Sequence, residues 1–149
     1  MVRKQAKEFF TLGYAAHTVA SMLELLSKNG IELLIDVREN PVSRRAGFSA
    51  AKLEAELARS GIQYAHFASL GTPTKIRLQY QKNGNALAAL KAYETYLDSR
   101  TSYLESLIQF ALPRRFCLMC LERDHSLCHR GVIAQKLAEM TRCRPIHLA

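Results

Sequence analysis

Long apolar segments are absent from this sequence of 149 residues. No apolar run approaches the ~20 residues that a membrane-spanning helix requires, so no membrane partner is expected. The opening MVRKQAKEFF is basic but lacks an apolar core followed by a small-residue cleavage site, so we expect no signal peptide there. Internal repeats, low-complexity runs and linkers are also missing, which predicts a single domain over residues 1–149.

Cysteine is scarce and unevenly placed. Of the four cysteines, Cys117, Cys120 and Cys128 lie close together near the end of the chain. That layout is a poor framework for disulfide bonds. We therefore expect free thiols and a reducing compartment, the cytoplasm.

Acidic residues are outnumbered, with 13 Asp and Glu against 21 Lys and Arg, which gives a formal net charge of +8. Such an excess favours an anionic partner, either a small molecule or a nucleic acid. A basic surface kept for solubility is the alternative explanation. No aromatic stripe alternates with arginine, so a base-stacking surface for single strands is not supported.

Short apolar segments alternate with helical patterns along the chain. Residues 31–37 are nearly all apolar, which is typical of an inner parallel strand covered on both faces. Thr18 and Ser49 are the expected N-caps of the first two helices. We predict strands over residues 9–14, 31–37, 62–67, 116–121 and 145–149, helices over residues 18–29, 49–59, 85–98, 101–112 and from 128, and loops over residues 40–48 and 70–77. This order predicts an α/β fold: one doubly wound, Rossmann-like, mostly parallel sheet with helices on both faces.

Polar side chains gather where the predicted strands end. Gly13 follows the first strand, Asp36 and Arg38 close the second, and Cys120 and Glu122 close the fourth. The stretch CLMCLERDHSLCHR, residues 117–130, also brings Cys128, His129 and Arg130 to a helix start. Since ligands bind at the carboxyl edge of parallel sheets, we expect a functional site there.

Anion binding is the first chemistry that these residues favour. A helix start offers unpaired N–H groups and the positive end of a dipole. Arg130 lies at that start, and Arg38 and Arg44 are expected to converge on it from the neighbouring strand end. The planar fork of arginine suits a phosphate, so these three arginines, with Gly13 in the first turn, form the candidate anion site.

Thiol chemistry is the second kind of chemistry that these residues favour. Cys128, at a helix start near Arg130, should have a lowered pKa and an accessible thiolate. Cys120 would lie across the turn as its catalytic or redox partner, although both thiols could instead be structural. Asp36 and Glu122 are candidate general acid/base groups, and Asp36 would equally hold Arg38 in an ion pair.

Metal binding is less favoured. Residues three apart on a strand, such as Cys117 and Cys120, point to opposite faces. Neighbours on a helix, such as Cys128 and His129, point about 100° apart. A three-ligand site from Cys120, Cys128 and His129 is the alternative that these directions leave open, but we predict no metal site. The sequence assigns no cofactor and no oligomeric state.

Several of these elements together resemble the domain-of-unknown-function 488 family of bacterial and archaeal proteins. The resemblance runs from about Thr11 to Leu148. This chain has Gly13-Tyr14-Ala15 where many members begin with Gly-His-Ser, so roles of that His and Ser do not transfer, and Cys117 lies outside the family pattern. The resemblance implies a fold and a site but no established reaction. The shared elements are Gly13, Asp36-Val37-Arg38, Pro41, Ser43-Arg44, Phe48, Leu70-Gly71, Cys120, Glu122 and Cys128-His129-Arg130.

Two functions remain. The first is a small enzyme that holds a phosphorylated or nucleic-acid-related substrate beside Cys120, Glu122 and Cys128. The second is a basic nucleic-acid-associated binding protein with structural cysteines. Convergence of the polar residues on one strand-end cleft favours the enzyme, because a backbone binder spreads its charge over a face.

Overall fold

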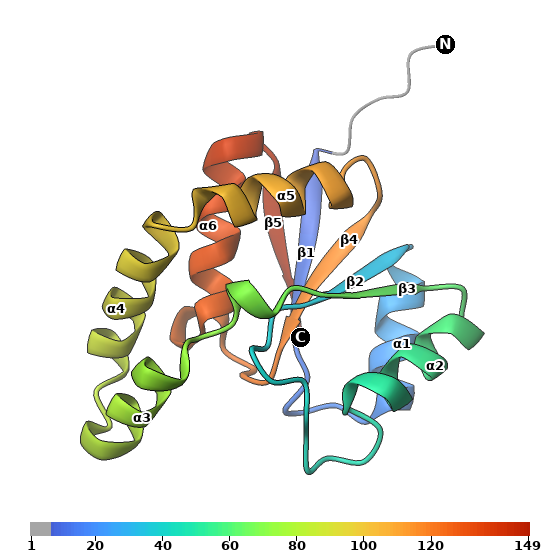
Figure 1. The fold of residues 1–149 in the computed structure, drawn as a ribbon. Coiled ribbons are helices and arrows are strands. Elements are labelled where there is room, and N and C mark those ends of the chain that lie inside the picture. Colours follow the sequence, from blue (N-terminus) through green and yellow to red (C-terminus); the bar gives the residue numbers. More distant parts are fainter. Residues whose placement is uncertain (1–6) are drawn as a thin grey trace.

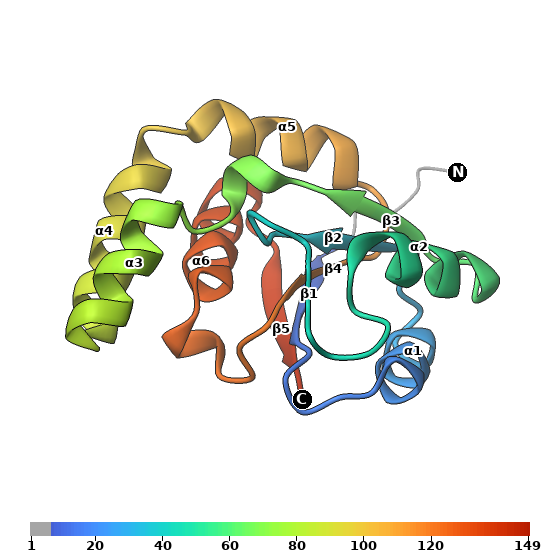
Figure 2. The same ribbon diagram turned by 60° about the horizontal axis from the view of Figure 1, so that its bottom comes forward.

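The fold is a parallel sheet with helices on both sides, as Figures 1 and 2 show. The structure, a computed structural model, describes residues 7–149. Residues 1–6, which carry part of the expectation about a signal peptide, lie outside the described residues. In the described part of the chain, no helix is long and apolar enough to cross a membrane.

The sheet formed by the described residues has five strands in the order β3-β2-β4-β1-β5, and every pairing is parallel. The predicted α/β class is therefore confirmed, with a sheet that is wholly parallel. The strands are β1 (Glu8–Gly13), β2 (Leu33–Asp36), β3 (Gln63–His66), β4 (Phe116–Cys120) and β5 (Arg144–Leu148).

Helices connect these strands. Two short 3-10 segments, η1 and η2, precede α3 and α6. The bounds are α1 (Val19–Lys28), α2 (Ala50–Arg59), η1 (Ala68–Leu70), α3 (Thr74–Asn83), α4 (Ala86–Asp98), α5 (Thr101–Ala111), η2 (His125–Leu127) and α6 (His129–Thr141).

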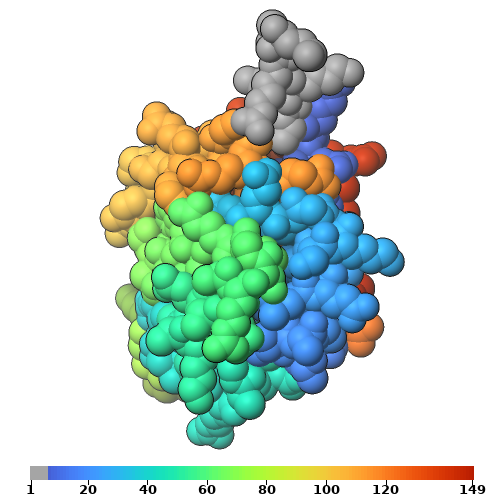
Figure 3. Space-filling view, turned by 90° about the vertical axis from the view of Figure 1, so that its right-hand side faces the viewer, coloured from blue at the N-terminus to red at the C-terminus, as the bar shows by residue number. Residues whose placement is uncertain are grey.

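Two apolar clusters lie on the two faces of the sheet. Helices α1 and α2 contribute Met22, Leu26, Leu53 and Leu57 to one cluster. Side chains of α4, α5 and α6 form the other cluster. Figure 1 shows these two groups of helices on opposite sides of the strands, and Figure 3 shows α1 and α2 covering the side that faces the viewer. The predicted layers are thus confirmed.

The inner strands follow the apolar pattern of the sequence. All residues of β2 and β4 are buried, because these strands lie between neighbours and are covered on both faces. Side chains alternate between the faces, so Cys117 belongs to the α1/α2 cluster and Cys120 to the cluster on the other side. The predicted divergence of these two thiols is confirmed.

The first helix begins as its sequence predicts. The Thr18 side chain accepts from the backbone N–H of Ser21, and the Ser21 hydroxyl accepts from Thr18 N–H, which forms a reciprocal capping box. Ser49 occupies the N-cap of α2, but its side chain does not cap the helix. Its hydroxyl instead accepts from Ser43 N–H at 3.1 Å and lies 3.3 Å from the Ser43 carbonyl, so it stabilises the preceding loop.

The prediction of a loop over residues 70–77 is wrong from Thr74 onwards, where α3 begins. The sequence of this helix, TKIRLQYQKN, has no apolar stripe, and none of its residues is buried. Sequence patterning detects helices by their buried face, so it is insensitive to this one. Gly84 ends α3 with a φ of 62°, a left-handed conformation that glycine adopts without strain.

Candidate functional site: a thiol pocket at the carboxyl edge of the sheet

A pocket of about 380 Å³ opens where β1, β4 and β2 end. Sheet-end residues form its floor, α6 contributes its first residues, and α3 and α4 form the opposite wall. The lining includes Tyr14, Arg38, Glu39, Cys120, Glu122, Leu127, Cys128 and His129, with Ile76, Arg77 and Tyr80 of α3 and Ala86, Ala89, Leu90 and Tyr93 of α4. A site at this edge is what the parallel topology favours.

Strand register sets the floor of the pocket. Gly13 pairs with Cys120, and Asp36 pairs with Met119, so the ends of three strands lie at one level. A Cβ on Gly13 would lie 1.7 Å from the carbonyl oxygen of Glu122. Gly13 is therefore needed for the close approach of β1 to the turn after β4.

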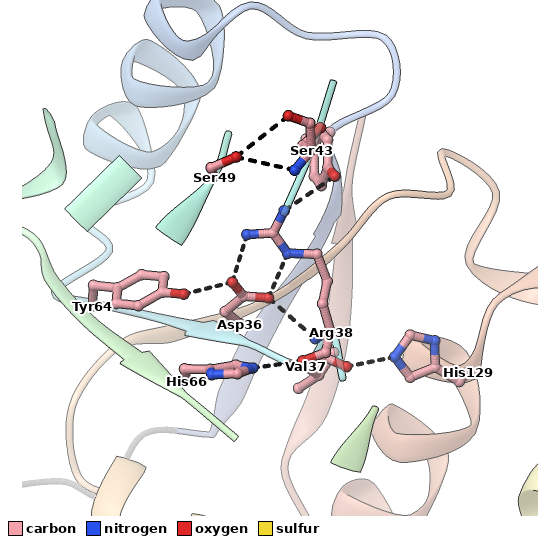
Figure 4. A network of polar contacts seen from close by, with 9 residues as sticks. Asp36, Val37, Arg38, Ser43, Ser49, Tyr64, His66 and His129 are labelled. Carbon is pink, nitrogen blue, oxygen red and sulfur yellow. Dashed lines mark hydrogen bonds and ion pairs between the residues drawn. The ribbon is translucent and has the colours of Figure 1, made fainter. Parts of the chain in front are cut away.

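Asp36 and Arg38 form a buried ion pair (Figure 4). Arg38 Nε donates to Asp36 Oδ1 at 2.8 Å and Nη2 donates to Oδ2 at 2.6 Å, which is a bidentate pair. Tyr64 donates to Asp36 Oδ2 at 2.6 Å, and Arg38 Nη1 donates to the Tyr14 hydroxyl at 3.2 Å. Burial alone would lower the pKa of Arg38, but the hydrogen bond and charge of Asp36 raise it above its usual value.

Two histidines fix the backbone beside this ion pair (Figure 4). His66 Nε2 bonds the Arg38 carbonyl at 2.6 Å, and His129 Nε2 bonds the Val37 carbonyl at 2.7 Å. Because a carbonyl only accepts, Nε2 of His129 carries the proton. In neutral His129, Nδ1 is then an acceptor, and it lies 3.4 Å from Cys128 Sγ.

Cys128 and Cys120 bring their sulfur atoms into contact at 2.6 Å. Cys128 is the N-cap of α6, where its sulfur accepts from the backbone N–H of Arg130 at 3.4 Å. The hydrogen bond from Cys120 lowers the pKa of Cys128, as do the Arg130 N–H and the guanidinium charge. Burial and the bond to Cys128 raise the pKa of Cys120 well above its ordinary value. The pKa shifts of the two sulfurs are therefore opposite in direction, and Cys128 is the one that ionises more readily.

Arg130 lies fully buried beneath this pair. Its Nε donates to Cys120 Sγ at 3.2 Å, Nη1 donates to the Thr11 hydroxyl, and Nη2 donates to the carbonyls of Glu122 at 3.0 Å and Arg123 at 3.3 Å. In the part of the chain that the structure describes, no carboxylate lies within ion-pair distance of it. A buried cation needs a compensating charge, and the contacting sulfur atoms are the available groups.

A polar chain continues from Arg130 to the edge of the sheet. Thr11 lies 2.6 Å from Nδ1 of His147, whose ring stacks on His125 with centroids 3.4 Å apart. Since the Thr11 hydroxyl accepts from Arg130, its proton is directed to His147 Nδ1. Burial, followed by the charges of His125 and Arg130, lowers the pKa of His147 to about 4, so this ring is neutral near pH 7.

The structure brings most of the predicted site residues together but separates others. Cys120, Glu122, Cys128 and Arg38 line the pocket. Asp36 lies behind Arg38, Arg130 lies under the two sulfurs, and Gly13 packs against the turn. Arg44 is exposed and outside the lining, so the three arginines do not converge. The catalytic and anion-binding roles assigned to these residues stay predictions.

Sequence reasoning missed several residues of the pocket. The α3 and α4 side chains belong to helices whose packing the sequence did not show. Tyr14 was not among the predicted site residues, yet its hydroxyl accepts from Arg38 Nη1 at 3.2 Å. His129 did have a sequence signal, because it directly follows Cys128, but only the fold directs one of its nitrogens to that sulfur. Among residues 7–149, no group of three or more His, Cys, Asp or Glu side chains is placed to hold a metal ion.

The fold and pocket define an all-parallel α/β protein with a paired-thiol site at the carboxyl edge of its sheet. The sequence profile described as Domain of unknown function DUF488 matches residues 18–137, which is most of the chain, so the chain belongs to this family. No curated protein and no solved structure matches the sequence significantly.

Proposed function

We propose that this protein is an enzyme in which the thiolate of Cys128 attacks an electrophilic substrate held in the pocket. The observation that carries the proposal is the setting of the Cys128 sulfur. It caps α6, accepts from Arg130 N–H, contacts Cys120 and belongs to a residue that lines the pocket. Reactive cysteines in proteins occupy electropositive helix starts of this kind, whereas structural thiols do not need them.

The charge balance around Cys128 supports a thiolate. Arg130 is a buried guanidinium whose other contacts are a hydroxyl and two carbonyls, all of them uncharged. One negative charge shared by the two sulfurs would compensate this buried cation. Whenever Cys128 is in its thiol form, Nδ1 of His129, 3.4 Å from that sulfur, can accept the proton and later return it to a leaving group.

The pocket also limits the substrate. Its lining contains two arginines, Arg38 and Arg77, and two glutamates, Glu39 and Glu122, so the charges balance. Arg38 is already paired with Asp36, and Arg77 donates to Glu39 at 2.8 Å. The predicted phosphate site is therefore the less supported part of the enzyme hypothesis. The thiol chemistry of Cys128 is the better supported part. Cys117, Cys120 and Cys128 are free thiols, which suits work in a reducing compartment such as the cytoplasm.

The pH dependence of alkylation tests this proposal. In a Cys117→Ser/Cys143→Ser background, iodoacetamide should modify Cys128 with a pKa well below the ~8.5 of a free cysteine. Cys128→Ser should abolish the fast reaction. A Cys128 thiol that titrates at or above ~8.5, with intact folding by circular dichroism, would refute the thiolate.

Nucleic-acid binding is the second candidate, supported by the net charge of +8 and by the exposed Arg44 and Arg45 in the loop before α2. If this loop contacts phosphates, affinity for a DNA duplex should fall steeply with salt, and Arg44→Gln/Arg45→Gln should reduce the salt slope by about 2. Cys128→Ser should leave that binding unchanged. Absence of salt-dependent binding at low ionic strength would exclude this function.

A further inference from the structure

We propose that Cys120 and Cys128 work as a dithiol couple that reduces a disulfide substrate. This inference rests on the proposed function, because it requires Cys128 to be the attacking thiolate. It goes further by giving Cys120 a chemical role and by naming the substrate class. The juxtaposition that supports it is the contact of two buried sulfurs, 1% and 5% exposed by residue, at the floor of a pocket.

The contact is held by rigid elements on both sides. Cys120 ends a central strand, and Cys128 caps the helix that follows the turn. The turn is packed so closely that a Cβ on Gly131 would lie 2.2 Å from the His125 carbonyl oxygen. Nη2 of Arg130 also bonds the Glu122 and Arg123 carbonyls of that turn. The two sulfurs are therefore positioned for reaction with each other before any substrate binds.

Disulfide reduction by a dithiol has two steps: one thiolate attacks the substrate, and the second thiol then displaces it. The two cysteines differ in pKa in the direction that these steps require. Cys128 has the lowered pKa and accepts the N–H of Arg130, so it is the attacking sulfur. Cys120 has the raised pKa and remains protonated during the first step. Arg130 Nε lies 3.2 Å from Cys120 Sγ, where it stabilises the second thiolate once Cys120 loses its proton.

The reaction balances as follows. The Cys128 thiolate attacks one sulfur of the substrate R–S–S–R, which forms a mixed disulfide on Cys128 and releases RS⁻. Cys120 gives its proton to the released thiolate, and its sulfur attacks Cys128 Sγ. An intramolecular disulfide forms and a second RS⁻ leaves. The substrate gains two electrons and the cysteine pair loses two, which a dithiol reductant then restores.

The other two cysteines provide matched controls. Cys117 is buried on the opposite face of the sheet, and burial raises its pKa. Cys143 follows the end of α6, outside the residues that line the pocket. Neither can take part in this exchange at the pocket, so Cys117→Ser/Cys143→Ser is the background in which the couple is examined.

The decisive experiment counts the thiols released from 5,5′-dithiobis(2-nitrobenzoate), a coloured aromatic disulfide, by the reduced background variant. We expect two equivalents of released thiolate per protein and a product that has lost two hydrogen atoms in mass, with peptide mapping placing the disulfide between Cys120 and Cys128. Added Cys120→Ser should stop the reaction at one equivalent, with a stable adduct on Cys128. Added Cys128→Ser should remove the fast phase.

The outcomes separate this inference from the function on which it rests. One equivalent and a stable mixed disulfide in the background variant would overturn the dithiol couple while leaving Cys128 as a nucleophile. Unchanged fast release in the Cys128→Ser variant would overturn both. A second small disulfide, bis(2-hydroxyethyl) disulfide, should give the same oxidised product, and its failure to do so at any concentration would contradict general disulfide reduction.

Discussion

Two buried arginines lie at the carboxyl edge of the sheet, and the protein compensates their charges in opposite ways. Arg38 has a carboxylate partner, Asp36, which it meets through two parallel hydrogen bonds. Arg130 contacts sulfur, a hydroxyl and carbonyls. In the first arrangement the two opposite charges compensate each other, so we call it the closed pair. Among the residues that the structure describes, the second arrangement has no carboxylate partner, so under the proposed function Arg130 is the arginine whose charge favours ionisation of a thiol.

The two arginines also belong to different faces. Asp36 and Arg38 lie with Tyr14 and Tyr64, next to the α1/α2 cluster, while Arg130 serves the sulfurs under α6. His129 connects the two regions, because its Nε2 bonds the Val37 carbonyl and its Nδ1 faces Cys128. The Asp36–Arg38 pair therefore contributes to the pocket lining through Arg38, and Arg130 lies against the sulfur that the proposed function uses.

The largest expected effect is on stability, from Asp36→Asn. This change leaves Arg38 buried without its counter-charge, which costs about 3–5 kcal/mol of unfolding free energy. Urea unfolding measures it. Glu56→Gln, which removes a partner of the exposed Arg59, is the control and should cost less than about 1 kcal/mol. Equal costs for the two variants would show that the buried pair contributes no more than an exposed one.

Removing the charge of Arg130 should mainly raise the pKa of the Cys128 thiol. Arg130→Met removes the charge near Cys128, so its pKa should rise, and alkylation near pH 7 should slow by about 10- to 100-fold, the range expected for hydrogen bonds to charged groups. Arg130→Lys keeps the charge and should restore much of the rate. Arg123→Met, an exposed arginine of the same turn, is the control. A full pH–rate profile provides the readout, and an unchanged profile in Arg130→Met would contradict the role of this charge.

His147 should make the Arg130 region sensitive to acid. Its pKa is lowered to about 4, so between pH 6.5 and 4 the unfolded chain binds more protons than the folded one. Stability should therefore be fully present above pH 6.5 and fall as the pH drops through this window. Partial exposure of the ring limits the effect to less than about 1 kcal/mol. His147→Gln should flatten this part of the pH profile in urea unfolding; a profile identical to that of the unaltered protein would exclude the assignment.

The smallest effect should come from Glu39, which joins the loop after β2 to α3 by accepting from Thr74 and Arg77. The two side chains of the ion pair are 33% and 47% exposed. Glu39→Gln should therefore lower the free energy of unfolding by less than about 1 kcal/mol. Chemical denaturation checks it beside Asp36→Asn. A loss as large as that of the buried pair would remove the distinction between closed and exposed ion pairs.

Much of the fold could be predicted from the sequence, since apolar runs such as β2 and β4 and helix starts such as Thr18 depend on local pattern. The strand-end positions of Asp36 and Cys120 and the helix-start position of Cys128 followed from the same reasoning. Helix α3 could not be predicted, because a helix without a buried face leaves no apolar period. Arg44 was expected in the site because it follows Arg38 closely, but an exposed loop carries it away from the pocket.

The sequence by itself determined which chemical groups reach the edge of the sheet, because strand period and helix capping are local properties of the chain. Only the tertiary structure decided how those groups pair. The bidentate bond of Arg38 to Asp36, the placement of Arg130 under Cys120 and the aim of His129 Nδ1 at Cys128 depend on atoms from different elements. Hydrogen bonds and charge pairs act over a few ångströms, so their partners are fixed only when strands and helices pack.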